Sequence, residues 1–452
     1  MTDTAQPGTA PDIETFLDNV PFSRFHVKVM ALGALAMLVD GFDLGVLSWV
    51  LPMVSDDFGV KRVDLTWVIS MQMIGMALGA YFIAPLADQV GRKKLVMIAM
   101  LGVSVCCFVT ILTQTVLQLA IARLVTGMFA SAVIANMVAL SSELAPARQR
   151  STVVTVVLAG AMPGAILGSL MQAFLLEPFG WHVAFWLGGV MPLLLLPPLL
   201  MFLPESPKFL ATRNPADPRL RAIVASLSPG GSPAAFTVPD KAEGSVSSLQ
   251  RVRELFAPGL ALPTTLLWLG FLGSFGFISA ATWKTTVFRD LVGLGWQNVG
   301  ITTGIGVVAG AIGMVTIGVT IDRYGFKAIV PTYFLIAAAA AIGMALLAPG
   351  WGMYVALAIN ALTQHAAHAG LASIASSLYP TRNRATGVGL AYGAGRAVSV
   401  IGPFYGALAL EHGWGALGYF FLLAGPLACA GVMLLILLTV RPIQAAGRVA
   451  AH

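Results

Sequence analysis

Charged side chains are scarce in this sequence. Asp, Glu, Lys and Arg make up 10% of its 452 residues, whereas a soluble domain carries about 25%. So few charges cannot cover a water-soluble surface, and 57% of the residues are hydrophobic. The composition therefore excludes an ordinary soluble globular protein and predicts a protein that crosses the membrane several times.

Cysteine is also scarce, and Cys106, Cys107 and Cys429 all fall within apolar segments. This placement argues against a disulfide framework. The polar, acidic N-terminus MTDTAQPGTAPDIETFLDNV has no basic segment ahead of an apolar one, so no cleaved signal peptide is expected. We expect the first hydrophobic span to direct insertion.

The sequence is rich in apolar runs of about 20 residues, which lack the two-residue alternation of a membrane barrel. They predict an all-α membrane protein with twelve transmembrane helices, near residues 27–53, 65–87, 95–113, 117–142, 151–175, 183–203, 260–283, 299–320, 328–347, 353–378, 387–410 and 416–440. The predicted order is a cytoplasmic tail at 1–24, a six-helix bundle at 25–203, a cytoplasmic linker at 204–258, a second six-helix bundle at 259–441 and a tail at 442–452.

Basic residues indicate how these helices are oriented. Most of the 26 Lys and Arg residues fall in the linker or on one side of the predicted spans. The positive-inside rule places that side, with both termini, in the cytoplasm. We therefore expect a multi-pass protein of the inner (cytoplasmic) membrane, in contact with the lipid bilayer. The net charge of +6 then reflects topology, and no nucleic-acid partner is expected.

The two halves repeat local patterns at a constant spacing. LAPARQRST at 144–152 corresponds to LYPTRNRAT at 378–386, and APLADQVGRKK at 84–94 corresponds to GVTIDRYGFK at 318–327. The second pair of segments follows the second helix of each half. Two six-helix repeats joined by a linker are typical of a transporter whose site lies near the midplane, between the repeats.

In each of these loops an aspartate ends the helix, a glycine permits a tight turn and a basic residue follows. The paired loops resemble those of the major facilitator superfamily, and the resemblance extends over residues 25–440. It implies the major facilitator fold, with two pseudo-symmetric bundles that alternate access while the loops latch the inward gate. The expected gating residues are Asp88, Gly91, Arg92, Glu143, Asp322 and Gly325.

Two aspartates, Asp40 and Asp43, interrupt the apolar run of the first helix. A charged residue at the bilayer centre costs roughly 2.5–3.5 kcal/mol on insertion scales, and such residues usually have a function. Their spacing places both on one helical face, and Gly41 and Gly45 permit another helix to approach closely. We expect these carboxyls to bind and release a proton. The alternative is a structural pair satisfied by hydroxyls or by a fixed Arg.

Two further basic residues fall within or beside predicted spans. Arg123 lies in the fourth helix, nearer the outer side, and matches the family's intramembrane Arg. We expect it to pair with the aspartates of the first helix in proton coupling, and a fixed structural ion pair is the alternative. Lys284, beside Trp283 at the outer end of the seventh helix, is expected to be an interfacial anchor, and a ligand-binding group is the less favoured alternative.

The second half contains a set of polar residues at mid-depth. Arg396 falls in the eleventh helix and His365 in the tenth, near Asn360 and Gln364. An anionic substrate needs a cation, and Arg can hold a carboxylate through two hydrogen bonds. We therefore expect these four residues to bind the substrate. His365 and His368 are alternatively packing histidines, and no accompanying Cys or carboxylate spacing supports a metal site.

The stretch DGFD at 40–43 resembles the Asp-Gly-x-Asp signature of the aromatic acid:proton symporters, a branch of the superfamily, and YPTRNRATGVGLAYGAGRAVSVIGP at 379–403 agrees. The C-terminus lacks the sugar-porter tail motif PETKG. The resemblance implies proton-coupled import of an aromatic carboxylate such as benzoate, hydroxybenzoate or protocatechuate. We expect a monomer that needs no cofactor.

The residues themselves support only an anion site with proton coupling. A carrier of a dicarboxylate or of a shikimate-like acid, or a sugar porter, therefore stays open. An enzyme is not expected, because the sequence shows no nucleophile–base set, metal-ligand spacing or Gly-rich phosphate loop. A channel is disfavoured because no ring of like charges is present.

Overall fold

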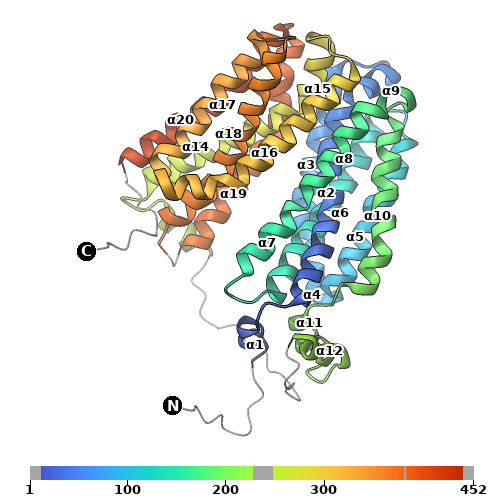
Figure 1. Ribbon diagram of the computed structural model, residues 1–452, viewed down its shortest axis with the longest axis vertical. Coiled ribbons are helices and arrows are strands. Elements are labelled where there is room, and N and C mark those ends of the chain that lie inside the picture. Colours follow the sequence, from blue (N-terminus) through green and yellow to red (C-terminus); the bar gives the residue numbers. More distant parts are fainter. Residues whose placement is uncertain (1–11, 228–247, 381–382, 441–452) are drawn as a thin grey trace.

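The computed structural model describes residues 12–227, 248–380 and 383–440. Two bundles of long helices meet at one end and diverge toward the end where both chain termini lie (Figure 1). The predicted all-α architecture is confirmed. Of the basic residues used to predict the topology, Lys241, Arg382, Arg441 and Arg448 lie outside the described residues.

The first bundle contains six apolar spans, all within the described chain. They are α2 (Arg24–Phe58), the segment Arg62–Val90, α5 (Arg92–Ile111), α6 (Val116–Leu144), the segment Arg150–Phe174 and α10 (His182–Phe202). The two composite spans consist of η1 (Arg62–Leu65), α3 (Thr66–Leu78), η2 (Gly79–Ile83), η3 (Ala84–Leu86) and α4 (Ala87–Val90), and of α7 (Arg150–Ala159) and α8 (Ala161–Phe174).

The second bundle also contains six long segments. They are Ala261–Leu291, α16 (Trp296–Tyr324), α17 (Phe326–Leu346), α18 (Trp351–Leu378), α19 (Arg384–Glu411) and α20 (Gly415–Val440). The first of these consists of α14 (Ala261–Ala280), η4 (Ala281–Trp283), α15 (Lys284–Thr286) and η5 (Val287–Leu291).

Among the described residues, ten helical segments are long and apolar enough to cross a membrane. The other two long helices of the bundles are α18 and α19, with 28 residues each. At about 1.5 Å per residue they exceed a hydrocarbon core of about 30 Å. They contain the polar residues Asn360, Gln364, His365 and Arg396, so their lower hydropathy coincides with the predicted site.

Short helices complete the described chain: α1 (Ile13–Asn19), α9 (Leu176–Phe179), α11 (Pro207–Arg213), α12 (Pro218–Leu227) and α13 (Ser248–Leu255). α1, α11 and α12 lie below the first bundle, at the end of the molecule where the bundles diverge (Figure 1). The side chain of Lys208 in α11 pairs with Glu14 in α1, and Arg150 pairs with Asp18. These contacts tie the N-terminal helix to the first bundle.

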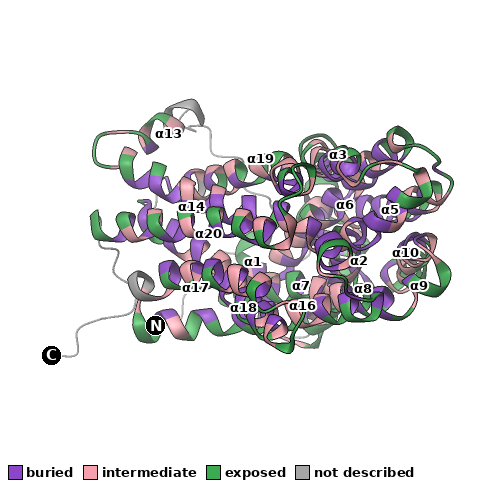
Figure 2. Cartoon of the chain, turned by 90° about the horizontal axis from the view of Figure 1, so that it is seen from above, coloured by how far each residue is buried: buried purple, intermediate pink, exposed green. Residues whose placement is uncertain are grey.

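Burial follows the two-bundle arrangement. Seen from above, buried positions concentrate inside each bundle and exposed positions on the outside (Figure 2). Many exposed side chains are large and apolar, such as Leu194 at 69% and Val315 at 80% exposure. A bilayer, unlike water, stabilises such a surface.

Glycines set the close contact between α2 and the α7–α8 span. A Cβ at Gly41 would lie 1.9 Å from the Ala161 carbonyl oxygen, and one at Gly164 would lie 2.0 Å from that of Leu38. Small residues are therefore required for this helix contact, as predicted for Gly41. At Gly45 the atoms nearest to such a Cβ belong to the Trp49 ring of the same helix, at 2.2 Å, so the missing side chain makes room for that ring.

Candidate functional site

The two aspartates of α2 have different surroundings. Asp43 is buried, and both of its carboxylate oxygens have hydrogen-bond partners. Its Oδ1 accepts a hydrogen bond from Arg123 Nη1 at 2.9 Å, and its Oδ2 accepts one from Gln72 Nε2 at 2.9 Å. Arg123 is fully buried, and its Nη2 donates to Thr126 Oγ1. The expected contact between Arg123 and an aspartate is therefore made by Asp43, while its role in proton coupling stays a prediction.

Asp40 lacks such partners. Its Oδ1 is buried and has no hydrogen-bond partner. Asp40 interacts electrostatically with Asp43, one turn away, and with Arg396 of the other bundle. An unpaired carboxyl beside a second carboxylate is costly to keep charged in low dielectric, so Asp40 is the group whose charge is most easily changed.

Arg396 faces the space between the bundles. One turn further along α19 the Val400 carbonyl accepts a hydrogen bond from Ser70 of α3, and another turn on Phe404 packs against Trp67 with ring centroids 4.9 Å apart. Arg396 is exposed on this same face and forms no salt bridge with any residue that the structure describes. Its guanidinium is therefore available to an anion that enters between the bundles.

The predicted substrate residues of α18 lie deeper in the second bundle. Asn360 is fully buried and donates from Nδ2 to the Ala337 carbonyl of α17 at 2.8 Å. Gln364 is also fully buried, and neither of its amide atoms has a partner. His365 Nδ1 lies 2.9 Å from the Ala361 carbonyl, and its ring packs over Gly310 of α16. Gln364 therefore has the hydrogen-bonding capacity that a ligand would use.

The sequence did not predict an aromatic cluster that lies beside Arg396. Tyr392, one turn before Arg396, has its ring centroid 4.9 Å from that of Phe271 and 6.1 Å from that of Phe275. Phe275 in turn packs on His368 at 4.9 Å, and His368 Nδ1 lies 2.8 Å from Ser274 Oγ. The signal was the spacing of Phe271 and Phe275, one turn apart in α14, but aromatic residues in apolar spans are too common to identify a site.

Lys284 does not lie where the sequence reasoning placed it. Its Nζ is 3.4 Å from Asn360 Oδ1 and 4.9 Å from the ring centroid of Phe277, two turns earlier in the same span. The prediction of an interfacial anchor is therefore wrong, because the amine points into the bundle. Helical side chains lean toward the N-terminus of their helix, and for this span that direction leads away from its end at Leu291.

The first of the two repeated loops forms an ion-pair network. Arg92 Nη2 lies 2.6 Å from Glu143 Oε1 of α6 and 3.8 Å from Asp88 Oδ1. Glu143 also accepts a hydrogen bond from Ser206 Oγ at 2.6 Å, and Glu205 accepts one from the Lys93 amide at 3.0 Å. The loop is thus linked to α6 and to the linker, and sequence reasoning missed Glu205.

The second loop has the same backbone turn with fewer contacts. Gly325 has φ +82°, as Gly91 has φ +102°. Asp322 is exposed and forms no salt bridge among the residues described, and nothing is described of the side chain of Lys327. The two loops therefore share the positive φ at their glycines, while the ion pairs among the described residues lie in the first loop.

We expect Asp88→Asn and Gly91→Leu to slow transport while substrate affinity stays nearly unchanged, because this loop lies at the end of its span, whereas Asp40 lies in the middle of α2. A Cβ at Gly91 would lie 2.5 Å from Glu205 Oε2, so leucine must displace the linker contact. The measurement is the initial uptake rate against substrate concentration. An affinity that collapses at an unchanged maximal rate would contradict a gating role.

The second loop supplies the matched control. In Gly325→Leu the leucine must also adopt a positive φ. A Cβ at this position, however, would have no atom of the described residues within 4 Å. Asp322→Asn breaks no ion pair of the described residues. We therefore expect both to reduce the transport rate less than their counterparts in the first loop.

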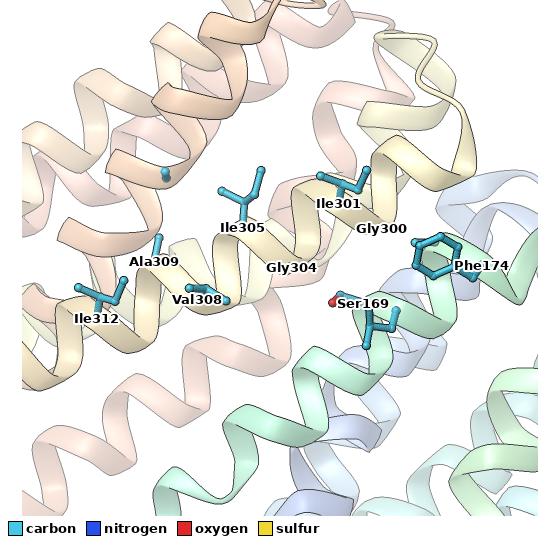
Figure 3. Close-up of a pocket in the computed structure, with 12 residues that line it drawn as sticks. Ser169, Phe174, Gly300, Ile301, Gly304, Ile305, Val308, Ala309 and Ile312 are labelled. Atoms are coloured by element: carbon cyan, nitrogen blue, oxygen red, sulfur yellow. The ribbon is translucent and has the colours of Figure 1, made fainter.

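A pocket of about 570 Å³ lies on the seam between α8 and α16 (Figure 3). Its lining is apolar except for the Ser169 hydroxyl, and Phe174, Ile301 and Ile312 border it. An anion site needs a cation or several donors, and this pocket has neither. It is therefore not the site of an acid, and its exposed apolar rim suits lipid chains.

Comparison with known proteins gives a consistent result. A family model described as Major Facilitator Superfamily matches residues 33–359 and 318–451. A gallate transporter of Pseudomonas putida is 32% identical over 95% of this chain and 96% of its own length. The 4-hydroxybenzoate transporter PcaK of the same species is 31% identical, over 90% and 91%, and a benzoate transport protein of Acinetobacter baylyi is 26% identical, over 87% and 85%.

Solved structures agree on the fold. A bacterial homologue of the human lysosomal transporter Spinster, in an inward-facing and unoccupied conformation, matches with a TM-score of 0.65 over 93% of this chain and 97% of that chain, at 14% sequence identity. The resemblance stated from the repeated loops and the DGFD stretch is thus confirmed, as is the expectation of a transporter and not an enzyme. The chain is a multi-pass membrane protein that belongs to the major facilitator superfamily and is related within it to aromatic-acid transporters.

Proposed function

We propose that this protein imports an aromatic carboxylate together with one or more protons by alternating access. The observation that carries the proposal is the position of Asp40 and Arg396, which interact across the two bundles and form no salt bridge with the other residues that the structure describes. The related proteins are named as transporters of gallate, 4-hydroxybenzoate and benzoate. The half-buried rings of Phe275 and Tyr392, which lie near Arg396 and are backed by the buried Phe271, suit an aromatic ring.

Competition for Arg396 provides the coupling. A charged Asp40 attracts the guanidinium, and a substrate carboxylate requires the same group. When Asp40 binds a proton this attraction ends, and Arg396 is free for the substrate. Binding of the acid and of the proton therefore favour each other, which is the requirement for symport. Asp43, held by Arg123, remains a fixed ion pair beside Asp40.

We place the protein in the inner membrane with both termini in the cytoplasm. The support comes from the basic residues at the end where the termini lie, such as Arg92, Lys93 and Lys94. In this orientation the two bundles diverge toward the cytoplasm (Figure 1). The opposite end is closed by contacts between the bundles, among them Arg62 Nε to Asp290 Oδ2 at 2.8 Å.

Uptake of a labelled panel tests the proposal. We expect accumulation of benzoate, hydroxybenzoates, protocatechuate or gallate that a protonophore abolishes. The panel also contains succinate, shikimate and glucose. Protonophore-sensitive uptake of one of these, without any aromatic acid, would overturn the aromatic assignment. Accumulation that a protonophore leaves unchanged would overturn proton coupling.

A further inference from the structure

Lys284 is a cation inside the second bundle that has no described counter-charge. Its amine contacts one amide oxygen, that of Asn360, and the face of the Phe277 ring. Among the residues that the structure describes, no carboxylate lies within 4.0 Å of it. A buried or partly buried ammonium without an anion is costly, and ionisable residues within spans usually bind an ion, a proton or a substrate.

The amide of Asn360 is already oriented for a neighbouring cation. Its Nδ2 donates to the Ala337 carbonyl, which leaves Oδ1 toward Lys284 Nζ. This single contact of 3.4 Å is long for a hydrogen bond of a charged donor, which is usually about 2.7–2.9 Å. Two further donor positions of the ammonium therefore remain for a ligand.

Gln364 is an independent indication of a ligand at this place. It lies one turn along α18 from Asn360, on the same face, and is fully buried with both amide atoms unpartnered. Buried amides almost always have partners, and an orphaned one requires an explanation. His365, the next residue, interacts electrostatically with Lys284. The amine of Lys284 thus contacts Asn360, and the unpartnered amide of Gln364 lies one turn further along α18.

This group lies next to the contacts that close the bundles. Thr282, two residues before Lys284, accepts a hydrogen bond from Ser48 through its carbonyl. Thr285, the next residue, accepts one through Oγ1 from Gln172 Nε2 at 3.3 Å. Lys284 is therefore nearer the closed end than Arg396, which lies in the middle of α19.

We propose that Lys284, Asn360 and Gln364 form a second anion subsite, on the closed side of Arg396, which takes the carboxylate of the transported acid. The inference rests on the proposed function, because the ligand is the same acid. A carboxylate suits the subsite because it accepts hydrogen bonds from the ammonium and from the Gln364 amide while neutralising the charge. Arg396 has Asp40 as an electrostatic neighbour, whereas Lys284 has no described acidic neighbour.

A row of side chains that interact electrostatically or through ring contacts connects the two subsites. Lys284 interacts with His365, and His365 with His368. Phe275 packs on His368 and on Tyr392, and Tyr392 interacts with Arg396. An acid that enters from the closed side when it opens would meet Lys284 first. It would reach Arg396 once a proton on Asp40 releases that guanidinium.

The test is ligand binding to the purified full-length protein and to Lys284→Gln, with benzoate, 4-hydroxybenzoate, gallate, succinate and shikimate as probes. We expect Lys284→Gln to weaken binding of the acid at least tenfold, and Lys284→Arg to retain most of the affinity. Binding of the corresponding neutral amide should not change. Lys61→Gln, which neutralises an exposed lysine, is the matched control and should bind as the wild type does.

Thermal melting without ligand gives a second readout. If Lys284 is an uncompensated charge, Lys284→Gln and Lys284→Met should melt at a higher temperature than the wild type, since both remove it. Variants that melt lower and bind the acid with unchanged affinity would show a structural lysine and overturn the subsite. If one of these two variants folds poorly, the melting temperature of the other still tests whether the charge of Lys284 is uncompensated.

The outcomes separate this subsite from the proposed function. Lys284-dependent binding of succinate or shikimate, with no aromatic acid bound, would refute the aromatic assignment and leave the subsite standing. Aromatic acids that bind the wild type and Lys284→Gln equally would refute the subsite and leave the proposed function standing. A wild-type protein that binds none of the five carboxylates would refute both.

Discussion

Asp40→Asn should abolish accumulation of the acid against its gradient while the protein remains folded in the membrane. Asparagine keeps the size of the side chain but cannot bind and release a proton. Asp40 has no ion-pair partner to lose, since its Oδ1 is unpartnered and Arg396 interacts with it only at longer range. For one proton per acid, each unit of pH difference supports about tenfold accumulation, and the variant should reach a ratio of about one.

The measurement is steady-state uptake into vesicles with an imposed pH gradient, alongside exchange of internal for external acid. Exchange should survive in Asp40→Asn if Asp40 couples transport to the proton gradient without binding the substrate. Asp64→Asn, at an exposed aspartate that accepts a hydrogen bond from the Lys61 amide, is the control and should accumulate normally. Full accumulation by Asp40→Asn would refute its role as the proton carrier.

Asp43→Asn should behave differently, because the structure pairs Asp43 with a fully buried Arg123. Breaking a buried ion pair by removing one partner costs about 3–5 kcal/mol. We therefore expect lower amounts of this variant in the membrane. The double variant Asp43→Asn/Arg123→Gln removes both charges and should restore the amount of protein, which separates folding from coupling.

Arg396→Ala should remove most of the affinity for the acid. Hydrogen bonds to charged groups contribute about 1.5–3 kcal/mol each, so loss of a two-bonded contact corresponds to at least roughly a hundredfold weaker binding. Arg396→Lys keeps the charge without the planar fork and should lose less. The neutral amide of the same acid should bind poorly and be almost insensitive to the substitution, because it has no charge to pair.

Titration of acid and amide into purified wild type and variants measures this effect. Arg323→Ala, at an exposed arginine at the far end of α16, is the control and should bind as the wild type does. Equal binding of the acid to wild type and Arg396→Ala would make Arg396 a structural cation. His365 and the Lys284 subsite would then remain as candidates for the carboxylate.

The sequence by itself determined the membrane class, the long helices of the two bundles and the repeated loop. Each span is a run of apolar residues whose backbone hydrogen bonds lie within its own helix, so its stability in a bilayer depends on local composition. The predicted spans accordingly agree with the helices to within a few residues at most ends, as in 117–142 against Val116–Leu144. The turn at Gly91 and Gly325 is local for the same reason.

Only the tertiary structure decided which side chains meet. Asp40 and Asp43 share a helical face, yet the packing of α2 against α6 brings Arg123 to Asp43 and leaves Asp40 unpaired. The same holds for Lys284, whose amine points to Asn360 of another helix, and for the aromatic cluster around Tyr392. These contacts join residues far apart in the chain. Their partners depend on how the helices rotate and pack against each other, which the hydropathy of any one helix does not encode.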